Sequence, residues 1–122
     1  MPISPEFRDY VLEMLQPFGL VRAKAMFGGA GLYADDTMFA LIANDVLYFR
    51  TDEGNVGEYE AAGCSPFQPF EHKPFKMPYY EAPPDIMEDA DELSDWARRA
   101  WEAARRNQKK KGGKKKPKSN KD

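Results

Sequence analysis

The sequence predicts a single α+β domain, with helices packed on one antiparallel sheet and a disordered, lysine-rich C-terminal tail. Apolar residues recur at helical spacing near both ends of residues 1–107, and short strand patterns with tight turns lie between them. The chain has 122 residues with 42% hydrophobic content, enough to bury one modest core. The expected order is helix, three strands, helix, two strands, helix.

The first helix is expected to begin at Ser4 and Pro5, because serine is a common N-cap and proline fits the first helical turn. It is expected to end before Pro17 and Gly19. Apolar residues at spacings of four, three and four describe its inner face: Phe7, Val11, Met14 and Phe18.

Three strands are expected next, at residues 31–34, 38–43 and 46–50. The pairs Asp35-Asp36 and Asn44-Asp45 between them are typical of two-residue hairpin turns. The three strands should therefore form an antiparallel meander.

Side-chain directions in the third strand follow from Arg50. Successive strand residues point to opposite faces, and Arg50 prefers water. Leu47 and Phe49 are therefore expected to point into the core.

A short second helix is expected over residues 53–62, with Val56 and Tyr59 facing inward and Gly63 ending it. Gly54 and Gly57 weaken this pattern.

Two further strands are expected at residues 67–72 and 75–81. Pro78 falls inside the second of them and favours an edge position or a bulge, because proline cannot donate a ladder hydrogen bond.

The last helix has the clearest pattern. Asp89 can cap it, with Glu92 three residues later. Its outer face is expected to pair Asp95 with the two arginines at 98 and 99, and Glu102 with those at 105 and 106. Its apolar stripe is Leu93, Trp96, Ala97, Ala100, Trp101 and Ala104.

Charge divides the chain near Asn107. Residues 1–107 hold ten Lys and Arg against nineteen Asp and Glu, a net charge of −9, whereas residues 108–122 hold eight Lys and one Asp, a net charge of +7. A self-repelling lysine run without apolar residues cannot offset the entropy of ordering. We therefore expect a domain over 1–107 and a disordered basic tail over 108–122.

Composition also limits the chemistry. Cys64 is the single cysteine and His72 the single histidine, too few for an internal disulfide or a structural zinc site. The start of the chain shows no signal-peptide pattern, and no stretch approaches the roughly 18 apolar residues of a membrane span. A cytoplasmic protein without cofactor or metal is expected.

Three patterns could indicate catalysis or ligand binding, and each has a simpler structural interpretation. The glycines of residues 28–31 lack the spacing of a phosphate-binding loop and precede a strand. Cys64 and His72 have no evident orienting third group, so a nucleophile with its base is not assembled. An acidic string lacks the pattern of a calcium loop and complements the dipole of the last helix instead: Asp85, Glu88, Asp89, Asp91 and Glu92.

Two surfaces are candidates for contact with partners. Met26, Phe27, Gly28 and Gly29 offer adaptable apolar area beside backbone that a partner can approach, although a buried Phe27 is the alternative. Tyr79 and Tyr80 could offer an aromatic platform, but adjacent strand residues face opposite sides.

The lysine tail could neutralise phosphates without sequence preference, or simply keep the protein soluble, or fold back on its acidic domain. The candidate nucleic-acid contacts are Lys109, Lys110, Lys111, Lys114, Lys115, Lys116, Lys118 and Lys121.

Two strings together point to a family: MFGGAGLY at residues 26–33 and KMPYYEAP at residues 76–83. With the spacing of the segments between them and of the closing Trp96, they resemble the N-terminal domain of the TfoX regulators of bacterial competence, over roughly residues 5 to 105. The resemblance implies an α+β sandwich and a regulatory role. In the family, a second, helical domain follows this one. Here the lysine tail takes its place, and this departure counts against a role in competence.

We therefore expect a non-enzymatic regulatory or interaction module that acts through contacts with an unidentified protein, as a monomer or weak homodimer. No assembled set of nucleophile, base and charge stabiliser is visible. The alternative is a small nucleic-acid-associated protein that uses its tail for nonspecific DNA or RNA binding.

Overall fold

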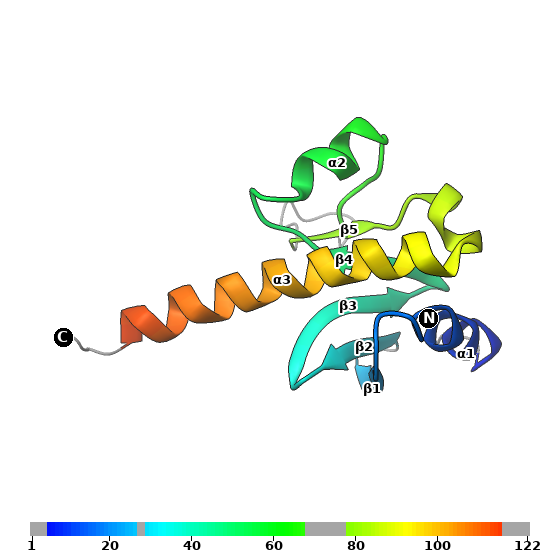
Figure 1. The fold of residues 1–122 in the computed structure, drawn as a ribbon, viewed down its shortest axis with the longest axis horizontal. Helices are drawn as coiled ribbons and strands as arrows, with labels where there is room; N and C mark the ends of the chain where they lie inside the picture. The colour runs from blue at the N-terminus through cyan, green and yellow to red at the C-terminus, as the bar shows by residue number, and fades with distance from the viewer. Residues whose placement is uncertain (1–4, 27–28, 68–77, 116–122) are drawn as a thin grey trace.

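The structure, a computed structural model, describes residues 5–26, 29–67 and 78–115. One antiparallel sheet of five strands, in the order β1-β2-β3-β4-β5, is covered on one face by α1 and α3 (Figure 1). The predicted α+β class is confirmed. In chain order the elements are α1 (Pro5–Met14), β1 (Arg22–Met26), β2 (Gly29–Ala34), β3 (Thr37–Ala43), β4 (Val46–Arg50), α2 (Val56–Ala61), β5 (Tyr79–Glu81), the 3-10 helix η1 (Pro84–Glu88) and α3 (Ala90–Lys115).

Strand β1 is absent from the predicted order. Its Arg22 and Lys24 alternate with alanines, and alanine is depleted in strands, so no apolar period marks it. It pairs with β2 along its whole length, up to Met26 opposite Gly29. Strands β1 and β2 are therefore antiparallel neighbours, where the sequence predicted only the entry into a first strand.

Both predicted hairpin turns are confirmed. Asp35 and Asp36 have φ of 51° and 61°, and Asn44 and Asp45 have φ of 53° and 58°. Positive φ at both central residues is the geometry of a type I′ turn, which Asn and Asp adopt more readily than other non-glycine residues.

A β-bulge interrupts the pairing of β2 with β3. Leu32 is opposite Ala40 and Tyr33 is opposite Met38, so Phe39 is the extra residue. Phe39 and Ala40 are both fully buried, although neighbouring strand residues normally face opposite sides. The bulge thus delivers a large aromatic ring to the core that regular alternation would not place there.

The core lies between the sheet and the helices α1 and α3. Leu47 and Phe49 are buried, as predicted. On α3 the small residues of the predicted stripe are buried and its two tryptophans pack at the margin. Alanines at three positions of this stripe let the helix lie close to β3 and β4.

The predicted inner face of α1 is confirmed by contacts of all four of its residues with the core. The fully buried Leu15, just past the helix, was not predicted. Helix α2 is shorter than predicted, with Tyr59 buried and Val56 half-buried. Ser4, the predicted cap of α1, lies outside the described residues.

Strand β5 is an edge strand that begins directly after Pro78, in agreement with the positional argument from that proline. Its outer side is bonded to the segment before residue 68, because the backbone N–H of Phe67 donates to the carbonyl of Tyr79 and that of Glu81 to Ser65. The remainder of the strand predicted at 67–72, and residues 75–77 of the next, lie outside the described residues.

Helix α3 begins as predicted, since the Asp89 carboxylate accepts a hydrogen bond from the Glu92 backbone N–H at 3.1 Å. The helix extends to Lys115, past the domain end predicted at Asn107. Lysine is a good helix former, so the lysine-rich segment is compatible with this extension. The disorder predicted for residues 108–122 stays a prediction, and residues 116–122 lie outside the described residues. The domain end at 107 stays a prediction.

The outer face of α3 confirms one predicted group of ion pairs and corrects the other. Asp95 pairs with both Arg98 and Arg99. Glu102, however, pairs with Arg98 at 3.6 Å, and Arg106 instead reaches a loop residue, Asp52. Sequence spacing could not identify Asp52 as a partner because it lies 54 residues away.

Candidate functional site

Of the predicted partner-binding residues, Gly29, Tyr79 and Tyr80 have packing roles. Gly29 is buried in β2, where a Cβ would lie 2.0 Å from the carbonyl oxygen of Ile42, which confirms the expected close backbone approach. Tyr79 is 5% exposed, and the half-buried Tyr80 places its ring 5.9 Å from that of Tyr59. As expected, the two tyrosines face opposite sides of the sheet. A partner contact through these residues stays a prediction.

Two further candidates of that set, Phe27 and Gly28, lie outside the described residues, and Met26 ends β1. Of the lysine candidates, five belong to the C-terminal turns of α3 and three lie outside the described residues. Among the described residues, Met26 and Gly29 lie on β1 and β2, whereas Tyr79 and Tyr80 lie on β5 at the opposite end of the strand order.

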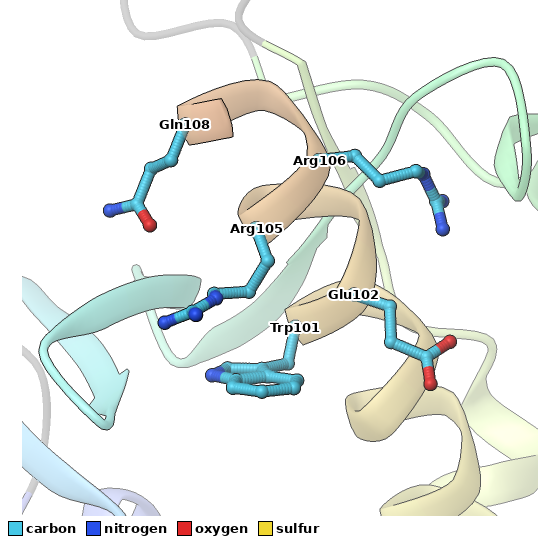
Figure 2. A pocket seen from close by; sticks show the side chains of 5 residues that line it. All are labelled: Trp101, Glu102, Arg105, Arg106 and Gln108. Atoms are coloured by element: carbon cyan, nitrogen blue, oxygen red, sulfur yellow. The ribbon is translucent and has the colours of Figure 1, made fainter. Parts of the chain in front are cut away.

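The described residues contain a different candidate, a pair of adjoining hollows along α3. The first has a volume of about 580 Å³, and Figure 2 shows the described residues that line it, which belong to α3: Trp101, Glu102, Arg105, Arg106 and Gln108. The second, of about 340 Å³, shares Trp101 and Glu102 with the first and extends toward Leu20 and the turn after β2. We call the two together the Trp101 surface.

Trp101 is fixed at the centre of this surface. Its indole N–H donates a 3.0 Å hydrogen bond to the carbonyl of Ala34, at the end of β2. The guanidinium carbon of Arg105 lies 5.2 Å from the centre of its ring, within the range of a cation–π interaction. Gln108 lies on the same side of α3 (Figure 2) and accepts a 3.2 Å hydrogen bond from the hydroxyl of Thr37. The surface is therefore attached to the β2–β3 hairpin at two points.

Leu20 forms the outer edge of the Trp101 surface and is 94% exposed. It follows Gly19, whose φ of 144° is a conformation that residues with a Cβ rarely adopt. The preceding Phe18 turns inward, with its ring 5.2 Å from that of Phe39. The chain therefore places one aromatic ring in the core and leaves the next large apolar side chain in water.

Sequence reasoning missed both Leu20 and the hollow. A single leucine between Gly19 and Val21 has no period that could mark it as exposed. The aromatic stripe of α3 did include Trp101, but its spacing predicts burial and not a half-buried position beside an arginine.

The charges of the surface are only partly paired. Arg98 is bonded to acidic residues of its own helix, and Arg106 donates to both carboxylate oxygens of Asp52, at 2.7 and 2.8 Å. Asp52 raises the pKa of Arg106 through these bonds. Within the described ranges, the side chains of Arg105 and Asp35 take part in no ion pair.

The surroundings of Cys64 do not favour a reactive thiol. Burial, with a contribution from the Glu81 carboxylate, raises the pKa of the Cys64 thiol, so the unreactive protonated form dominates near neutral pH. His72 lies outside the described residues. Burial also raises the pKa of Tyr59, against the opposing charge of Arg99, and keeps that phenol neutral.

Among the described residues no group of three or more His, Cys, Asp or Glu side chains could hold a metal ion. None of the helices described is both long and apolar enough to span a membrane.

The fold defines a small α+β domain in which a five-stranded antiparallel sheet is covered on one face by α1 and by the long helix α3, which carries the Trp101 surface. The chain belongs to the TfoX N-terminal domain family, whose model matches residues 13–104. It is also similar to the DNA transformation protein TfoX1 of Aliivibrio fischeri (strain ATCC 700601 / ES114), with 33% identity over 54 residues. The matched segment is 44% of this chain and 26% of that relative, so the chain covers about a quarter of the relative's length.

Proposed function

We propose that this protein is a non-enzymatic regulator of the TfoX type and that it acts through protein contacts at the Trp101 surface. The observation that carries the proposal is the exposure of Leu20 at the edge of a partly apolar hollow. An isolated exposed leucine is ordinary, but one beside a hollow lined by Phe18 and Trp101 is typical of an interaction site. Membership of the family and the name of the relative support a role in competence or a related regulatory process.

Replacement of Leu20 by Asp should abolish the regulatory effect and leave the fold intact. Because the side chain is 94% exposed, the free energy of unfolding should change by less than about 0.5 kcal/mol. The measurement compares transcripts and transformation frequency in a deletion strain that carries either the wild-type gene or this variant. Ala61→Asp adds the same charge at an exposed position of α2 and should behave as wild type.

Equal complementation by Leu20→Asp and wild type would show that this surface is not used. A deletion strain with unchanged transcripts and unchanged transformation would contradict the regulatory function itself.

A second candidate function is nonspecific nucleic-acid binding through the lysine-rich end of the chain. The change of net charge from −9 to +7 near residue 107 supports it, and so does the extension of α3 to Lys115. Acidic residues lie next to the part of α3 that precedes this end, since Asp52 is bonded to Arg106 and Asp35 lines a hollow with Trp101. Any binding should therefore depend on the lysines alone.

Removal of residues 109–122 should eliminate binding to DNA and RNA while retaining the contact of Gln108 with Thr37. Fluorescence anisotropy with a labelled oligonucleotide measures the affinity. In the intact chain, log affinity should fall with log salt with a slope no steeper than about 0.9 per lysine engaged. Thermal stability should hardly change. Equal binding by the truncated protein would exclude the lysines as the contact.

A further inference from the structure

We propose that the Trp101 surface binds a second copy of this chain and forms a two-fold symmetric dimer. The proposal rests on the function proposed above, because it names the occupant of the same surface. It is carried by the combination of a projecting side chain, a receiving hollow and two unpaired charges of opposite sign on one face.

The apolar part of the proposed interface consists of Leu20 and the hollow beside it. In a two-fold interface the same patch meets itself, so each contact between two residues occurs twice and the patch must be self-complementary. Leu20 is the projecting group, at 94% exposure, and it stands at the rim of the hollow of about 340 Å³. The other lining residues are apolar at Phe18, Ala34 and Trp101 and charged at Asp35, Arg98 and Glu102. Leu20 of each copy can therefore enter the hollow of the other.

The proposed interface also pairs two charges of opposite sign, those of Asp35 and Arg105. Asp35 lines one half of the Trp101 surface and Arg105 the other, and neither makes an ion pair in the part of the chain that the structure describes. A two-fold arrangement brings Asp35 of one copy against Arg105 of the other, twice. A surface with a single sign of charge would repel its own copy, whereas this surface carries both signs at its two ends.

The free edge of β1 is less suitable for self-association. An antiparallel pairing of two copies centred on Lys24 would place two lysines directly opposite each other, and one centred on Ala23 would place Arg22 opposite Lys24. Like charges at directly opposed strand positions are destabilising. Two of the symmetric registers of this edge are therefore unfavourable.

Sedimentation equilibrium of the full chain tests the proposal, over concentrations up to about 1 mM at about 0.1 M salt. Wild type should show a concentration-dependent dimer. Leu20→Asp should weaken the dimer at least about 100-fold, because each dimer loses the burial of two leucines. The exposed control Ala61→Asp should leave the dissociation constant unchanged.

A double-mutant cycle tests the symmetry. Asp35→Asn keeps a residue suited to the positive φ of that turn, and Arg105→Gln removes the exposed cation. Each should weaken the dimer about 2- to 10-fold, as expected for two exposed ion pairs, and the double variant should be no weaker than either single variant. Losses that add in the double variant would overturn the two-fold arrangement.

A single-copy mass at every concentration would also overturn the proposal, as would a dimer that Leu20→Asp leaves intact. If wild type is monomeric and Leu20→Asp still fails to complement, another protein occupies the surface, and only the dimer is wrong. If Leu20→Asp is monomeric and complements fully, the dimer stands and the proposed use of this surface in regulation fails.

Discussion

Replacement of Gly29 by Ala should destabilise the domain by more than about 3 kcal/mol, at the upper end of overpacking penalties. A Cβ at this position would lie 2.0 Å from the carbonyl oxygen of Ile42 and 3.1 Å from its carbonyl carbon. Close contacts of carbon with a carbonyl oxygen are normally about 3.3 Å or longer. Both atoms belong to the backbone of β3, so the strand itself would have to move. Chemical denaturation measures the loss.

Gly57→Ala provides the matched control. Gly57 lies in α2 with no atom within 4 Å of a Cβ, and the same substitution there should be neutral or stabilising by up to about 1 kcal/mol, because alanine is the better helix former. Equal behaviour of the two variants would show that β2 and β3 do not approach as closely as described.

Phe39→Ala is expected to cost about 3 to 5 kcal/mol, the range for removal of a fully buried phenylalanine. Phe39 is the extra residue of the β-bulge, and its ring lies 5.2 Å from that of Phe18 and 6.5 Å from that of Phe49. The ring therefore links the turn after α1 with β3 and β4. The measured quantity is again the free energy of unfolding, with the slope against denaturant checked for two-state behaviour.

Met38→Ala is the control for this prediction. The residue precedes Phe39 in the same strand, pairs with Tyr33 and is half-buried, so its loss should cost clearly less. A cost below about 1 kcal/mol for Phe39→Ala would mean that the bulge does not direct this ring into the core.

The parts of the fold that were predictable depend on local physical rules. The stripe of α3 repeats over several turns, so burial of Leu93, Ala97 and Ala100 could be inferred from spacing alone. The turn at Asp35-Asp36 was predictable because few residue pairs tolerate two successive positive φ values. In both cases a short segment carries its own signal.

The parts that were missed depend on contacts between distant segments. β1 is held by its pairing with β2 and not by an apolar pattern of its own. The bond between Arg106 and Asp52 joins residues 54 apart, and no local rule selects it over Glu102. The Trp101 surface likewise forms only when the chain around Leu20 and the end of β2 meet α3. A sequence can suggest which residues are apolar, but it cannot show which of them remain in water after folding.

The position of α3 has a consequence for synthesis of the chain. The sheet exposes its inner face, including Leu32, Phe39 and Phe49, until α3 is available to cover it, and α3 is the last of the described elements to leave the ribosome. At roughly 5 to 20 residues per second, the 54 residues from Thr51 to Ala104 take about 3 to 11 s to appear. During this interval the nascent meander presents an uncovered aromatic surface to the cell. The protein should therefore engage chaperones during translation, and a pause in synthesis before residue 104 should increase its aggregation.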